Sequence, residues 1–107
     1  MILYHFCCKH SAKGIRETGE LLPGRDGFVW LTDLASPLPE HVGLTSDYLT
    51  CRRTERRFKV ADQTGVIAWA DLRDSLRPGL VASLEAWDEA RPDHWFVSRR
   101  PVPVIVR

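Results

Sequence analysis

Four short apolar segments, each with a polar or aromatic side chain set within it, constrain this chain more than any other feature. A β-strand buries one face and presents the other, so a polar residue among large apolar residues can line a cleft between sheets. We therefore expect strands that bring such residues to a cleft. The segments are Leu3-Tyr4-His5-Phe6, Phe28-Val29-Trp30-Leu31-Thr32, Cys51-Arg52-Arg53-Thr54-Glu55-Arg56-Arg57-Phe58 and His94-Trp95-Phe96-Val97-Ser98.

The sequence between these segments predicts an α+β fold with split, mostly antiparallel sheets around a cleft. Ser11 and Gly19 are typical start and stop signals for a helix over Ala12–Thr18. Further helices are expected over 68–76 and Leu80–Ala90, and their grouping favours α+β over a doubly wound parallel sheet. A long loop is expected over 33–46. The predicted strands are Ile2–Cys7, Phe28–Thr32, Thr54–Val60, His94–Ser98 and Val102–Val106.

Length and composition indicate one soluble domain spanning residues 1–107. Apolar residues make up 44% and charged residues 27% of the chain, which is ordinary for a globular protein. The formal net charge of +1 excludes a strong overall attraction to nucleic acid or to a membrane. No apolar run approaches the roughly 20 residues that span a bilayer, and no signal peptide is visible. We expect a cytoplasmic protein with no membrane partner.

The cysteines point away from disulfides and metal. Their number is three, and an odd count is typical of a reducing compartment. Cys7 and Cys8 lie near His5 and His10, but the four lack the usual spacing of zinc ligands. We therefore expect small buried thiols and no metal site.

Set side by side, the segments resemble the ADP-ribosyltransferase-like superfamily, which includes NAD-dependent toxins, RNA phosphotransferases that use NAD, and small bacterial and phage proteins. Leu3-Tyr4-His5-Phe6, followed by Ser11–Gly19 and Leu21, looks like the family's first strand and helix. Val29-Trp30-Leu31-Thr32 looks like its second motif strand. The resemblance implies NAD as the cofactor and activity as an ADP-ribosyltransferase or NAD glycohydrolase.

The resemblance also implies roles for individual residues. His5 stands where the family's histidine holds the NAD ribose, and Trp30 and Thr32 stand where a tyrosine stacks on the nicotinamide. His5 and Thr32 are therefore the catalytic candidates. The family's late glutamate has no counterpart in His94-Trp95-Phe96-Val97-Ser98, which leaves enzymatic activity open.

Two arginines and a tryptophan complete the predicted nucleotide site. Arg53 and Arg57 share one face of their strand, where guanidinium groups can clamp phosphates by forked hydrogen bonds. The alternative is a solvated strand edge, where cations discourage aggregation. Trp95 offers a stacking surface for a base or belongs to the core. The candidate binding residues are His5, Trp30, Thr32, Arg53, Arg57 and Trp95.

Each candidate is also compatible with a structural role. His5 is typical of a half-buried histidine that bonds a carbonyl, Trp30 of a core residue and Thr32 of a loop cap. Two other functions therefore stand beside the enzyme. One is a non-catalytic module that binds a nucleotide (NAD or ADP-ribose) or a nucleic-acid end, and the other is a phage protein that interacts with its host. A carboxylate in the cleft would distinguish the enzyme from both.

Overall fold

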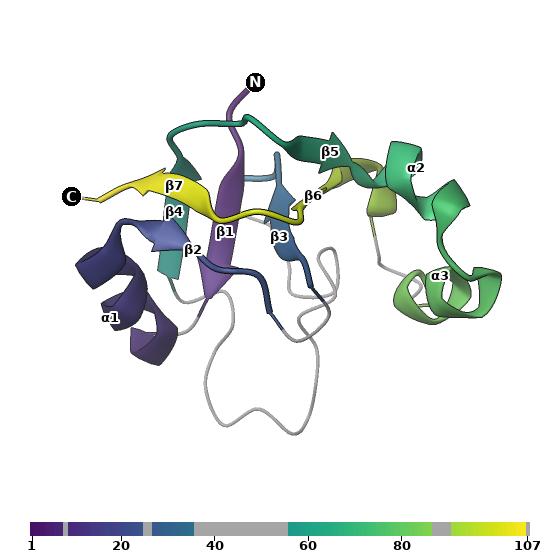
Figure 1. Ribbon diagram of the computed structural model, residues 1–107, viewed down its shortest axis with the longest axis horizontal. Helices are drawn as coiled ribbons and strands as arrows, with labels where there is room; N and C mark the ends of the chain where they lie inside the picture. Colours follow the sequence, from purple (N-terminus) through teal and green to yellow (C-terminus); the bar gives the residue numbers. More distant parts are fainter. Residues whose placement is uncertain (8, 25–26, 36–55, 87–90, 107) are drawn as a thin grey trace.

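Seven antiparallel strands form one curled sheet, with short helices at its two ends (Figure 1). The computed structural model describes residues 1–7, 9–24, 27–35, 56–86 and 91–106, and these counts refer to them. The strand order is β2-β7-β4-β1-β3-β6-β5. The strands are β1 (Tyr4–Cys7), β2 (Glu20–Leu21), β3 (Val29–Thr32), β4 (Arg56–Val60), β5 (Val66–Ala68), β6 (Trp95–Ser98) and β7 (Val102–Ile105), and the helices are α1 (Lys9–Thr18), α2 (Trp69–Leu72) and α3 (Pro78–Leu84).

Helix α1 ends where the sequence predicts and begins earlier. It starts at Lys9, so Ser11 lies inside the helix and not at its N-cap. Gly19 has a φ of 73°, a left-handed conformation that glycine adopts without strain, and its amide donates to the carbonyl of Ile15 at 2.7 Å. Ala12 is fully buried and Ile15 packs against the core, so the helix lies on the sheet through its apolar side.

The two faces of the sheet carry separate hydrophobic clusters. We call the face that carries Phe58, Leu31 and Val104 the first face, and α1 packs on it. The first-face cluster consists of Leu3, Cys7, Ala12, Leu21, Val29, Leu31, Phe58, Val102 and Val104.

The second face is covered at one end only. Over β3, β6 and β5 it carries a cluster of Trp69, Leu72, Val81, Trp95 and Val97, which α2 and α3 complete. Over β1 and β4 the same face carries Tyr4, Phe6, Arg57 and Lys59, and the described helices pack elsewhere (Figure 1).

The α+β class and the antiparallel pairing are confirmed, whereas the predicted division into two sheets is wrong. The strands belong to one sheet, but β1 and β3 share a single paired position, Tyr4 opposite Thr32. We call this junction the β1–β3 seam. Beyond it the two strands part, and each continues its pairing with another neighbour, β4 or β6.

Several boundaries differ from the predicted ones. The predicted helix over 68–76 is split into α2 and a 3₁₀ turn, η2 (Arg73–Ser75), and α3 ends at Leu84. His94 belongs to a second 3₁₀ turn, η3 (Pro92–His94), so β6 begins one residue later. Positions 36–55 and 87–90 lie outside the described residues, and with them most of the predicted loop. None of the described helices is long and apolar enough to cross a bilayer.

Candidate functional site

His5 lies at the β1–β3 seam, where its ring bonds the backbone of β3. Its Nδ1 donates to the carbonyl oxygen of Trp30 at 2.9 Å, which fixes the proton on Nδ1 because a carbonyl only accepts. Burial lowers the pKa of His5 from its ordinary value, and the bond to Trp30 offsets part of that effect. The ring is therefore neutral near pH 7.

The structure does not bring His5 together with Thr32 and Arg57. Residues directly opposite in an antiparallel pair share a face, and His5 lies opposite Phe58 on the first face. Arg57 lies opposite Phe6, and Thr32 lies opposite Tyr4, both on the second face. A ligand on the second face that contacted Arg57 would have the sheet between itself and the first-face cluster around His5.

Trp30 and Trp95 belong to the aromatic part of the second-face cluster. The ring centroids of Trp30 and Trp69 are 5.2 Å apart, and Trp95 makes edge-on contacts with both at 6.0 and 5.9 Å. Phe28 adds a fourth ring, 5.9 Å from Trp30. Trp95 is only 5% exposed, so its ring fills the core and offers no surface to a base.

Thr32 is buried and serves the turn after its strand. The Thr32 side chain is 2% exposed, and its Oγ1 accepts the amide of Leu34 at 3.1 Å. This contact shapes the turn that follows β3. Thr32 therefore has the structural role of a loop cap, which was the alternative to a role in binding. Arg53 lies outside the described residues.

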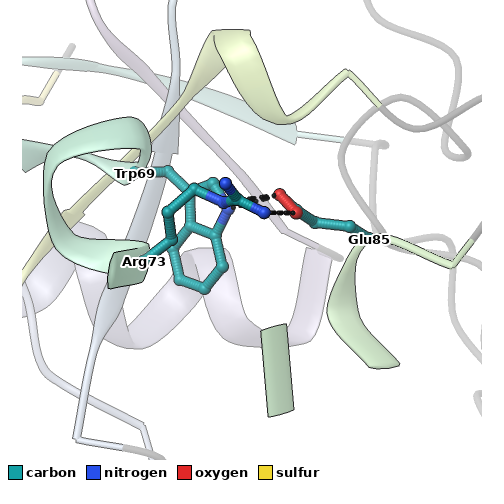
Figure 2. A network of polar contacts seen from close by, with 3 residues as sticks. All are labelled: Trp69, Arg73 and Glu85. Atoms are coloured by element: carbon teal, nitrogen blue, oxygen red, sulfur yellow. Dashed lines mark hydrogen bonds and ion pairs between the residues drawn. The ribbon is translucent and has the colours of Figure 1, made fainter. Parts of the chain in front are cut away.

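A polar network of Trp69, Arg73 and Glu85 links α2 and η2 to the end of α3 (Figure 2). Glu85 accepts a hydrogen bond from Nε1 of Trp69 at 3.2 Å. The same carboxylate accepts two bonds from Arg73, through Nε at 3.1 Å and Nη2 at 3.0 Å. Because Trp69 is fully buried, Glu85 supplies the partner that its indole N–H needs inside the protein.

Glu85→Ala should therefore lower the free energy of unfolding by about 1–3 kcal/mol, the cost of leaving a buried donor unpaired. Arg73→Ala removes only the exposed half of the network and should cost less than about 1 kcal/mol. Urea denaturation of both variants beside the parent measures the difference. Equal losses in the two variants would show that the bond to Trp69 contributes nothing.

The sequence analysis did not single out Asp33, which forms a cluster with His94 and Asp93. Nδ1 of His94 is 2.6 Å from Oδ1 of Asp33, and its Nε2 is 3.4 Å from Oδ2 of Asp93. Asp33 follows the paired residue Thr32 and His94 precedes its partner Trp95. In the sequence, each of these two residues can be seen only as a neighbour of a predicted strand. The register that pairs Thr32 with Trp95 is what brings Asp33 and His94 together. Within the described ranges, no group of three or more histidine, cysteine, aspartate or glutamate side chains, this cluster included, has an arrangement that could hold a metal ion.

Among the predicted site residues that the structure describes, Arg57 is exposed and is held by two contacts. Its guanidinium carbon lies 4.8 Å from the ring centroid of Tyr4, and its Nη1 donates to the carbonyl of Ala35 at 2.8 Å. Phe6 lies beside Arg57 and Lys59 beside Tyr4 on the same face. We call the surface formed by Tyr4, Phe6, Arg57 and Lys59 the basic–aromatic face.

Fold and surface together define a small α+β protein whose curled antiparallel sheet presents a basic–aromatic face. Comparisons with protein-family models, with curated proteins and with solved structures found no match for this chain. The resemblance to the ADP-ribosyltransferase-like superfamily therefore stays a prediction.

Proposed function

We propose that the protein binds a phosphate-bearing nucleotide, of the NAD or ADP-ribose class, at Arg57 on the basic–aromatic face. In this proposal it acts as a binding module and not as a transferase. The observation that carries the proposal is the Arg57 guanidinium, which is exposed, laid on Tyr4 and tethered at one edge to Ala35.

A guanidinium held in this way is preorganised to bind an anion. It has five N–H donors in a fixed plane, and within the described part of the chain one of these nitrogens donates, to Ala35. The stacking on Tyr4 and this bond restrict the side chain before a ligand arrives, which reduces the entropy lost on binding. The remaining edge can donate two parallel hydrogen bonds to phosphate oxygens.

The contacts of the other candidates support binding over catalysis. Cleavage of the nicotinamide bond needs a carboxylate near the developing ribosyl cation. Asp33, the carboxylate next to Thr32, is paired with His94. His5, the candidate for holding the ribose, is bonded to Trp30 at the seam. His5 lies on the first face of the sheet and Arg57 on the second, so the ribose candidate and the phosphate candidate do not share a surface.

Arg57→Ala should weaken the binding of ADP-ribose and NAD by roughly 10- to 100-fold, the worth of a hydrogen bond to a charged group. Arg57→Lys should restore little, because lysine supplies a point charge without the fork. Neither change should alter the free energy of unfolding by more than about 0.5 kcal/mol. Isothermal titration calorimetry, with thermal melting alongside, measures both quantities.

Arg99→Ala is the matched control, because Arg99 is also an exposed arginine stacked on an aromatic ring, 5.6 Å from the centroid of Phe28. Its dissociation constants should equal those of the parent. Affinity that is unchanged in Arg57→Ala would remove Arg57 from the site. Release of nicotinamide from NAD over repeated turnovers would instead make the protein an enzyme.

A further inference from the structure

We infer that the ligand of the basic–aromatic face is single-stranded nucleic acid, with successive phosphates along β4 and a base stacked beside them on Phe6. This inference rests on the proposed function and names the class of its ligand. It follows from the arrangement of four side chains on two neighbouring strands.

The four side chains form two columns. Phe6 lies opposite Arg57, and Tyr4 lies opposite Lys59, so β1 contributes the aromatic column and β4 the basic column. Arg57 and Lys59 are two residues apart on one strand, which separates their Cα atoms by about 7 Å. A second exposed cation at that spacing suits a ligand whose phosphates repeat along an extended backbone.

The aromatic column offers one ring to a base. Tyr4 is covered by the guanidinium of Arg57 and is largely buried. Phe6 is half-buried, with its ring centroid 6.4 Å from that of Tyr4. A base stacked on Phe6 would lie next to the planar Arg57 side chain, and aromatic rings and guanidinium planes are the surfaces on which unpaired bases stack.

The local charge favours a polyanion although the net charge of the chain is only +1. The strands β1, β4 and β7 contain no aspartate or glutamate. Among the described strand residues of this face, the one carboxylate is Glu20 on the edge strand β2, beyond β7. Asp33, which follows β3, is paired with His94. The attraction is therefore confined to the area around Arg57 and Lys59, and it should weaken with salt.

A single strand fits this face better than a duplex does. Paired bases stack on each other and hide their rings, whereas an unpaired base can turn toward a side chain in the sheet. A free nucleotide such as ADP-ribose could engage Arg57, but its two phosphates share one bridging oxygen and lie too close together to follow β4 as far as Lys59, two residues further along.

The test is fluorescence anisotropy with a labelled oligothymidylate of about ten nucleotides, the length range that small single-strand-binding folds cover. The parent protein should bind it at least tenfold more tightly than ADP-ribose and more tightly than a duplex of equal length. Lys59→Ala should weaken oligonucleotide binding more than ADP-ribose binding, and it should reduce the logarithmic salt slope for the oligonucleotide by about one. Lys13→Ala, an exposed lysine on α1, is the matched control.

Phe6→Ala should weaken oligonucleotide binding by about 5- to 100-fold, the usual worth of one stacked base. Phe6→Leu keeps an apolar side chain of similar size and should lose nearly as much, which separates stacking from a folding defect. Arg57-dependent binding of ADP-ribose without tighter binding of the oligonucleotide would overturn this inference and leave the proposed function standing. Equal affinity for duplex and single strand would also overturn it, and binding of neither ligand would overturn both proposals.

Discussion

Replacing Trp69 by alanine is expected to lower the free energy of unfolding by about 3–5 kcal/mol, the usual cost of removing a buried tryptophan. Trp69 is fully buried and contacts Trp30 and Trp95. The change would open a cavity among these rings and would leave Glu85 without the indole N–H. Small domains have total stabilities of about 5–15 kcal/mol, so the loss is a large share of the whole.

Urea denaturation followed by circular dichroism measures this effect without relying on tryptophan emission. Trp69→Phe should fall between the parent and Trp69→Ala, because it fills part of the cavity. Leu80→Ala is the control, since Leu80 lies on α3 but is 46% exposed and should change stability by less than about 0.5 kcal/mol. A loss in Trp69→Ala no larger than that of Leu80→Ala would mean that the aromatic cluster does not hold α2 and α3 on the sheet.

Acidification is expected to destabilise the protein through His5. Its pKa in the folded state is lowered from 6.5, chiefly by burial, so the unfolded chain takes up the proton first as the pH falls. Above about pH 6.5 the ring is neutral in both states, and this contribution to stability is fully present. Below that value it is lost progressively until the lowered pKa of the folded state is reached.

The measurement is the free energy of unfolding at several pH values between about 5 and 8, for the parent and for His5→Asn. The asparagine amide does not titrate but can still donate to the carbonyl of Trp30, so the variant should show a shallower loss below pH 6.5. His5→Leu removes the donor and should cost about 1–3 kcal/mol throughout the range. Identical pH profiles for parent and His5→Asn would show that other groups account for the acid sensitivity.

Elements with strong local signals were predictable from the sequence. The alternation of Arg57 and Lys59 with Phe58 indicates a strand with one wet face, and β4 has Phe58 buried between two exposed cations. The apolar run that contains Trp30 predicts β3 to within one residue. Gly19 marks the end of α1 because it needs a left-handed backbone that few other residues adopt. In each case the information lies within a few residues of the element.

The remaining features depend on partners far away in the sequence. The strand β2 has two residues and pairs with β7, and β5 has three residues and pairs with β6, so neither shows a periodic pattern. The sequence also did not show which face of the sheet each candidate residue occupies. Alternation tells which residues of one strand share a face, but only register shows that His5 and Arg57 point to opposite sides. For this reason the prediction that the candidate residues meet in one cleft was wrong for His5 and Arg57.

From the position of β7 we expect its strand pairing to form late in folding. It lies between β2 and β4, and its Val102 and Val104 complete the first-face cluster. Its partners in β2 are Glu20 and Leu21, so this pairing must close a loop that spans most of the chain. The chain loses conformational entropy when such a loop closes, before the contacts of the pairing form. Folding is therefore slower when the paired residues are further apart in the sequence. Pairings between strands that are closer in the sequence, such as β5 with β6, are expected to form earlier, and the pairing of β7 with the edge strand β2 follows.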